Sequence, residues 1–261
     1  MTDTHLAAVG AATPAEARTA RVAEDAGQAT QRCLARLGAV AALGGAALLL
    51  VATLLHPLGS DPNDPHAAFA EYAADTRWVW SHLGQFAGLA LLGMALVALA
   101  ATLEPGRAAA WARIGATGAA ATIALAAALQ AVDGVALKVM VDRWAAATGD
   151  ARALAYEAAF AVRQVEIGLA SLLSVVSGLT LIAFGVALIL SHRYPRWLGG
   201  LGLLGGLGMT AAGVAQASTG FSGPAMTLSM AASSALLVWA VLAGALLWRV
   251  PPRLADDRDV A

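Results

Sequence analysis

Few side chains in this sequence could carry acid–base or metal chemistry, and five of them lie at the ends of apolar segments. They are His56, His82, Gln85, Gln130 and Asp133. Two imidazoles, a carboxylate and two amides can exchange a proton, bind a metal ion or hydrogen-bond a polar molecule. Ionisable groups inside membrane spans are costly, so such residues are functional candidates.

Helix geometry places these residues at one depth. His56 follows Arg36, and Asp133 follows Arg113, by about 20 residues, which is roughly 30 Å of helix and close to the thickness of a bilayer's hydrocarbon core. His82 is about equally far from the inner end of its own segment. The sequence therefore predicts one polar layer at the outer membrane boundary.

Two interpretations of this layer stay open. Its members can be ordinary headgroup-zone residues that reach water, or they can face inward and line an outward-opening pocket for a small molecule or lipid. Trp78, His82 and Gln85 share a helix face by their i, i+4 and i+3 spacing, and Gln130 and Asp133 share another. The shared faces favour a common target, and a transport function would use such a pocket.

Two ion pairs are predicted next to this layer. Lys138 and Asp142 are spaced i,i+4, and Arg163 and Glu166 are spaced i,i+3. We expect both pairs on the solvated face of a helical hairpin. Glu166 is also a pocket candidate, because a tilt of its helix would bring it toward Asp133 or His82.

Metal or haem chemistry is an alternative function. His56 and His82, with Asp133 or Glu166, would supply the ligands of a His₂-carboxylate zinc site, and the two histidines alone would be haem ligands. The sequence has no HExxH pattern and no paired histidines on one helix. The identity of any cofactor therefore stays undetermined.

Composition requires a membrane for most of the chain. Of 261 residues, 59% are hydrophobic and 13% are charged, with a mean hydropathy of +0.69, whereas soluble domains carry about 25% charged residues. The uncharged segments are Leu37–Leu55, Leu83–Leu103, Ile114–Val132, Ile167–Ser191, Leu198–Gln216 and Ala225–Trp248, the last two divided by a turn at Gly220–Pro224. We predict an all-α, polytopic bundle of six transmembrane helices.

The distribution of arginine and lysine predicts that both termini are cytoplasmic, in the inner (plasma) membrane of a cell. Basic residues gather at one end of the segments and are fewer at the other. We expect a cytoplasmic tail over 1–36, a membrane domain over 37–250 and a second tail over 251–261. The net charge of −1 and the scattered basic residues argue against a nucleic-acid partner.

Local patterns predict further helices outside the six spans. Thr13–Glu16 has the form of a capping box, although a loosely ordered tail is an equal alternative there. Asp64-Pro65 is typical of an N-cap and first helical residue, which predicts a short helix over His66–Ala74. The third and fourth spans are expected to extend beyond the membrane as a hairpin, helical to about Trp144 and again from near Ala151.

The fifth span is rich in glycine. Gly199, Gly202, Gly206 and Gly213 fall near one face, and Gly202 and Gly206 form a GxxxG pair. We expect this face to pack against neighbouring helices of the same chain. A homo-oligomer through Gly202 and Gly206 is the alternative, and it corresponds to a non-catalytic interaction subunit.

The order of short motifs resembles an uncharacterised family of bacterial six-span membrane proteins, a domain-of-unknown-function group. The resemblance rests on motifs between Leu37 and Trp248, namely His56-Pro57, the Asp-Pro stretch, Trp80-Ser81-His82, Asp133 to Lys138, and Tyr194-Pro195-Arg196-Trp197-Leu198-Gly199. It implies six spans. It implies no activity, substrate or site residue.

Overall fold

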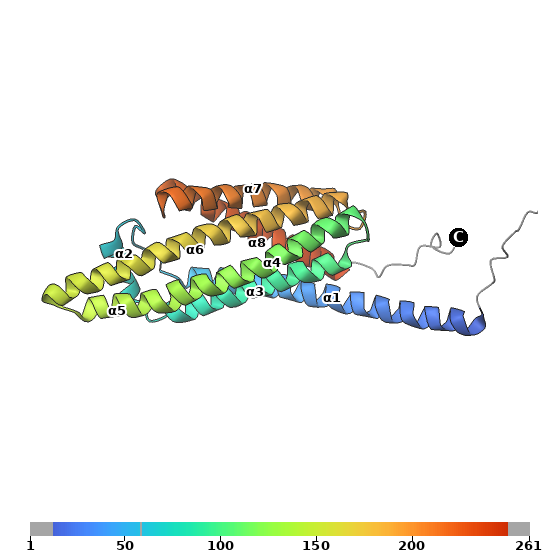
Figure 1. The fold of residues 1–261 in the computed structure, drawn as a ribbon, viewed down its shortest axis with the longest axis horizontal. Helices are drawn as coiled ribbons and strands as arrows, with labels where there is room; N and C mark the ends of the chain where they lie inside the picture. The colour runs from blue at the N-terminus through green and yellow to red at the C-terminus, as the bar shows by residue number, and fades with distance from the viewer. Residues whose placement is uncertain (1–12, 58, 250–261) are drawn as a thin grey trace, which may run out of the picture. The chain divides into compact units, whose positions relative to one another are not determined.

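A computed structural model describes residues 13–57 and 59–249. The described chain is all-helical, and six of its helices are long and apolar enough to cross a membrane (Figure 1). These are α1 (Pro14–Leu54), α3 (Trp78–Thr102), the continuous α4 (Arg107–Gln130), η1 (Ala131–Leu137) and α5 (Lys138–Ala146), then α6 (Gly149–Leu190), α7 (Arg196–Thr219) and α8 (Gly223–Arg249). The predicted six-span, all-α architecture is confirmed.

The chain divides into two compact units, one of them comprising residues 34–250. Of the other unit the structure describes residues 13–33. At its start the Glu16 carboxylate accepts a hydrogen bond from the Thr13 amide at 2.7 Å, and the Thr13 hydroxyl accepts one from the Glu16 amide at 3.3 Å. The predicted capping box is therefore confirmed, and α1 continues from it without a break. The predicted tail 251–261 lies outside the described residues.

The long helices of the 34–250 unit alternate in direction. Four of the five connections between them are short, and the connection from α1 to α3 contains α2. We call the end where α3 begins the His82 end, and the end where α3 finishes the Glu104 end. At the Glu104 end, the Glu104 carboxylate accepts hydrogen bonds from the Ser191 hydroxyl at 2.8 Å and the His192 amide at 2.5 Å. The predicted turn between the fifth and sixth spans is present: Gly220, with φ of +62°, ends α7.

Close contacts between glycines hold α7 against α6. A Cβ added at Gly206 would lie 2.7 Å from the carbonyl oxygen of Gly178, and one added at Gly199 would lie 2.6 Å from that of Gly185. Gly202 instead faces Trp239 of α8. The glycine face of α7 therefore packs within the chain, as expected, and an oligomer through Gly202 and Gly206 would require α7 to leave these contacts.

Besides the core between the long helices, a separate core lies at the His82 end. It joins the short helix α2 (Pro65–Ala74) to the hairpin of α5 and the first turns of α6, and it includes Phe69, Trp78, Val141 and Trp144. Asp64 caps α2 by accepting hydrogen bonds from the His66 and Ala67 amides, as predicted. The hairpin extends past the other helices of this unit, and α2 lies beside it (Figure 1).

Candidate functional site

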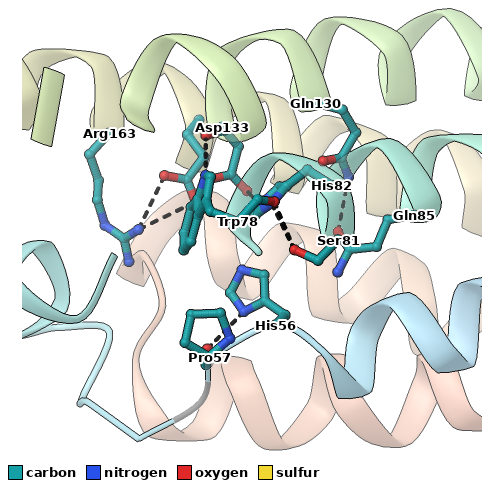
Figure 2. Close-up of polar contacts among 10 residues, drawn as sticks. His56, Pro57, Trp78, Ser81, His82, Gln85, Gln130, Asp133 and Arg163 are labelled. Atoms are coloured by element: carbon teal, nitrogen blue, oxygen red, sulfur yellow. Dashed lines mark hydrogen bonds and ion pairs between the residues drawn. The ribbon is translucent and has the colours of Figure 1, made fainter. Parts of the chain in front are cut away.

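A π-helical segment positions Asp133 opposite His82. The segment η1 interrupts α4–α5 over Ala131–Leu137, and such interruptions are frequent at functional sites. Gly134 lets α3 approach this segment, because a Cβ at position 134 would lie 2.5 Å from the Cβ of His82. The Trp78 indole donates a hydrogen bond to the Asp133 carbonyl at 3.0 Å. The wide turn is therefore fastened to the start of α3 (Figure 2).

His82 is held at both ring nitrogens. Its Nδ1 lies 2.7 Å from the carbonyl oxygen of Trp78, and its Nε2 lies 3.0 Å from Oδ2 of Asp133. A carbonyl oxygen only accepts, so Nδ1 carries a hydrogen. One further proton is shared between Nε2 and the carboxylate. His82 is 1% exposed and the Asp133 side chain 15%, so this proton is largely shielded from water.

Two buried acceptor oxygens, one on Asp133 and one on the neighbouring Gln130, receive no hydrogen bond from the described residues. Gln130 is 8% exposed and its amide donates to Oε1 of Gln85 at 3.2 Å. Its own Oε1 has no hydrogen-bond partner among the described residues, and neither has Oδ1 of Asp133. Leaving a buried acceptor unsatisfied costs about 1–3 kcal/mol. The cluster thus contains two unsatisfied acceptors, one helical turn apart on η1 and the end of α4.

His56 closes the cluster from the connection that follows α1. Its ring lies 4.9 Å from the rings of both Trp78 and His82, measured between centroids. Nδ1 donates to the Pro57 carbonyl at 2.7 Å, which leaves a lone pair on Nε2. Burial lowers the pKa of His56, and the nearby His82 lowers it further, which outweighs the opposite effect of Asp133. His56 is therefore neutral at pH 7.

The expectation that Arg163 and Glu166 form a solvated ion pair is wrong. The pair exists, with NH1 3.2 Å from Oε2, but the side chains are only 4% and 5% exposed. The guanidinium lies over the rings of Tyr72 and Phe221 and donates to the Pro62 carbonyl at 3.1 Å. The pair is buried because α2 and the connection before it fold over this part of α6. Glu166 interacts electrostatically with Asp133, so it belongs to the cluster, as the sequence suggested.

Polar contacts hold in place the segment that covers Arg163 and Glu166, which is α2 with the connection before it. The Glu71 carboxylate accepts hydrogen bonds from the Gly59 and Ser60 amides at 2.8 Å each. Slight burial raises the pKa of Glu71, but these hydrogen bonds outweigh it and the net pKa is lowered. Lys138 pairs with Asp142 at 2.6 Å, as predicted, and also donates to the carbonyl at the end of α2. The polar cluster therefore lies beneath a fastened cover.

The donor set does not match a metal or haem site. Among the described residues no three His, Cys, Asp or Glu side chains are grouped to hold a metal ion. Both nitrogens of His82 are already engaged, by Trp78 and Asp133. The rings of His56 and His82, at 4.9 Å between centroids, are in contact with each other, so no cofactor fits between them.

The structure brings together most of the residues that depth counting selected. His82 contacts both His56 and Asp133, and Gln85 and Gln130 are hydrogen-bonded to each other (Figure 2). Glu166 is near enough to Asp133 for the two carboxyl groups to interact electrostatically. Sequence reasoning missed Tyr72 and the burial of Arg163. No local signal could have found the second, because the burial of Arg163 depends on where α2 packs.

Comparisons with protein-family models, with curated proteins and with solved structures give no match. The function must therefore be argued from the cluster itself, and the family resemblance of the short motifs stays a prediction.

Proposed function

We propose that this multi-pass membrane protein binds a small molecule or lipid in the polar cluster at its His82 end, as a step in transport. The observation that carries the proposal is the pair of buried acceptors, Oε1 of Gln130 and Oδ1 of Asp133, that lack a donor. A ligand with N–H or O–H groups would satisfy both. Charged and polar groups placed inside spans are typical of substrate and proton pathways, which supports transport.

The protonation of the site supports a ligand that donates hydrogen bonds. The pair of His82 and Asp133 holds one shared proton and has no net charge, and the pair of Arg163 and Glu166 is also neutral. No uncompensated positive charge in this cluster attracts an anion. The unsatisfied atoms are all acceptors, so a hydroxyl or ammonium group fits and a carboxylate or phosphate does not.

The alternatives are less well supported. A metal- or haem-dependent enzyme would have to break the hydrogen bonds that hold His82. An interaction subunit using Gly202 and Gly206 would have to expose glycines that now pack against α8 and α6. No unsatisfied or exposed group supports either rearrangement, whereas the two unsatisfied acceptor oxygens support ligand binding.

We propose that the protein lies in the inner membrane of a bacterial cell. In the proposed orientation the His82 end is outside the cell and both termini are in the cytoplasm. The positive-inside rule supports this orientation, because Arg107, Arg193 and Arg196 lie at the Glu104 end. Labelling intact cells with a membrane-impermeant maleimide tests it. Asp150→Cys at the hairpin tip, in a Cys33→Ala background, should react in intact cells, and native Cys33 only after lysis; the opposite pattern would invert the topology.

Native mass spectrometry of protein extracted in mild detergent tests the site. We expect one bound molecule per chain in the wild type and in Asp142→Asn, a control outside the cluster whose side chain is 49% exposed. Gln130→Leu and Asp133→Ala, which each remove one of the two acceptors, should lose it while keeping a cooperative thermal transition. A wild-type protein that never carries a bound molecule, or an adduct that survives both cluster variants, would refute the proposal.

Transport is tested with the molecule so identified. The wild type in proteoliposomes should exchange a deuterated form of that molecule between lumen and medium, and Gln130→Leu should slow the exchange. Binding without any exchange would restrict the protein to a receptor or carrier of that molecule within the membrane, and would refute the transport part of the proposal.

A further inference from the structure

An apolar cavity lies between the helices at mid-depth, below the polar cluster. Its volume is about 50 Å³, and α1, α3, α4, α6 and α8 all contribute to its wall. By the usual allowance of about 10–15 Å³ per water-sized group, it has room for roughly four such groups. Among its lining residues are Leu89, Leu92, Thr122 and Ala243.

The cavity offers no polar partner at its threonines. The Thr122 hydroxyl donates to the carbonyl of Gly118 at 2.9 Å, and the Thr180 hydroxyl donates to that of Val176 at 2.7 Å. Both hydroxyls are thus used within their own helices. Ser177 adds one further hydroxyl to the wall, but an ordered water needs two to four polar partners, so the cavity accepts apolar groups instead.

The cavity and the polar cluster lie on the same faces of two helices. On α3, the cluster residues His82 and Gln85 are followed at steps of three or four by the cavity residues Leu89 and Leu92. Gln85 and Leu89 are therefore separated by only about 6 Å along the axis.

On α4 and the following η1, cluster residues and cavity residues again share one face, but here the cavity residues come first in the sequence. The cluster residues Asp133 and Gln130 are preceded by the buried Ala126 and then by Thr122 of the cavity. From Gln130 to Thr122 the axial distance is roughly 12 Å. The small side chain of Ala126 lies between the two sites. A polar end and an apolar end thus follow one another along a single inter-helical seam.

We propose that the ligand is a single-chain amphiphile, with a head that donates hydrogen bonds to Gln130 and Asp133 and a hydrocarbon chain that enters the apolar cavity. This inference rests on the proposed function and names its ligand class. A purely polar solute would leave the cavity unused. The cavity has room for the last few groups of one hydrocarbon chain, whose earlier part would lie along the seam, and not for the ends of two phospholipid chains. Hydroxyl and primary ammonium heads share the required chemistry.

The test uses the full chain in nanodiscs of phosphatidylcholine, whose headgroup has neither N–H nor O–H donors, with native mass spectrometry as the readout. Dodecylamine and dodecanol probe the two heads, dodecyl methyl ether lacks a donor, and ethylamine supplies a head without a chain. We expect one bound dodecylamine or dodecanol per chain and no bound ether. The probe that binds more tightly identifies the head. Preferential retention of an added phosphatidylethanolamine over both single-chain probes would refute the single-chain class.

Three variants separate this inference from the proposed function. Ala243→Leu fills the cavity and should weaken binding of the twelve-carbon probe at least fivefold, because each buried CH₂ group that it displaces contributes about fourfold in affinity. It should leave ethylamine binding unchanged. Ala245→Leu, two residues away on the exposed face, should change neither. Gln130→Leu should abolish binding of both.

The outcomes are distinguishable. If Ala243→Leu binds the long chain as the wild type does while Gln130→Leu does not, the amphiphile is refuted and the proposed binding site stands. If binding is indifferent to Gln130→Leu as well, both are refuted. Should Ala243→Leu fail to give a cooperative thermal transition, the smaller Ala243→Val is used, and unchanged binding of the long chain by that variant counts against the inference equally.

Discussion

The shared proton between His82 and Asp133 predicts that two substitutions of the same aspartate differ sharply in cost. Asp133→Ala removes a hydrogen bond to a charged group, worth about 1.5–3 kcal/mol. It also leaves Nε2 of a ring that is 1% exposed without a partner. Allowing for the 15% exposure of the aspartate, we expect a loss of about 3 kcal/mol in the free energy of unfolding.

Asp133→Asn should cost about 1 kcal/mol or less. Neutral His82 still donates from Nδ1 to Trp78, and its Nε2 lone pair can accept from the new amide, so the contact survives in neutral form. The substitution also removes the repulsion between Asp133 and Glu166. Denaturation in mixed detergent micelles measures both free energies, and ¹⁵N NMR of the imidazole should show hydrogen on Nδ1 in each protein. Equal losses for the two variants, or a bare Nδ1, would refute the shared-proton description.

The remaining predictions concern packing and pH. Gly134→Ala should destabilise the protein by about 1–3 kcal/mol, because the added methyl group would clash with His82. Its control is Gly168→Ala, which has open space around it and should be neutral or stabilising. Thermal melts in one detergent compare the two variants. Gly206→Ala should destabilise by a similar amount through the Gly178 carbonyl, and Gly200→Ala, which has no neighbour within 4 Å, should not. The folded-state pKa of His56 is lowered, so its stabilising contribution is complete above the unfolded pKa near 6.5 and is lost as pH falls through the folded value. His56→Phe should flatten that part of the curve of unfolding free energy against pH, and a slope identical to that of the wild type would contradict the assignment.

The sequence was sufficient for the spans and for the depth of the polar residues, because both follow from local physics. Length and hydropathy define helices that cross a bilayer, and a fixed rise per residue puts His56, His82 and Asp133 at one level. The cap at Asp64 was predictable for the same reason: its side chain satisfies amides only two and three residues away. These features need no knowledge of which helix packs against which.

Contacts that depend on the tertiary arrangement were not predictable. Whether Arg163 and Glu166 reach water depends on where α2 folds, and nothing local to α6 indicates that a helix about 90 residues earlier covers it. The π-helical turn at Asp133 is likewise set by the approach of α3 at Gly134 and by the Trp78 indole. Periodicity could put Gln130 and Asp133 on one face, but it could not show that their oxygens lack donors.

The position of the cluster supports our proposal that these residues serve binding rather than stability. It lies where the core of the spanning helices, with Leu92 and Phe184, meets the separate core under α2, with Phe69 and Trp78. Apolar side chains of similar volume at a buried ion pair are often neutral or stabilising. A buried arginine–glutamate pair, two unsatisfied acceptors and a distorted helical turn therefore cost stability at one place. A donor ligand that satisfied the two acceptors would recover part of that cost, which couples occupancy of the site to the packing of the cover above it.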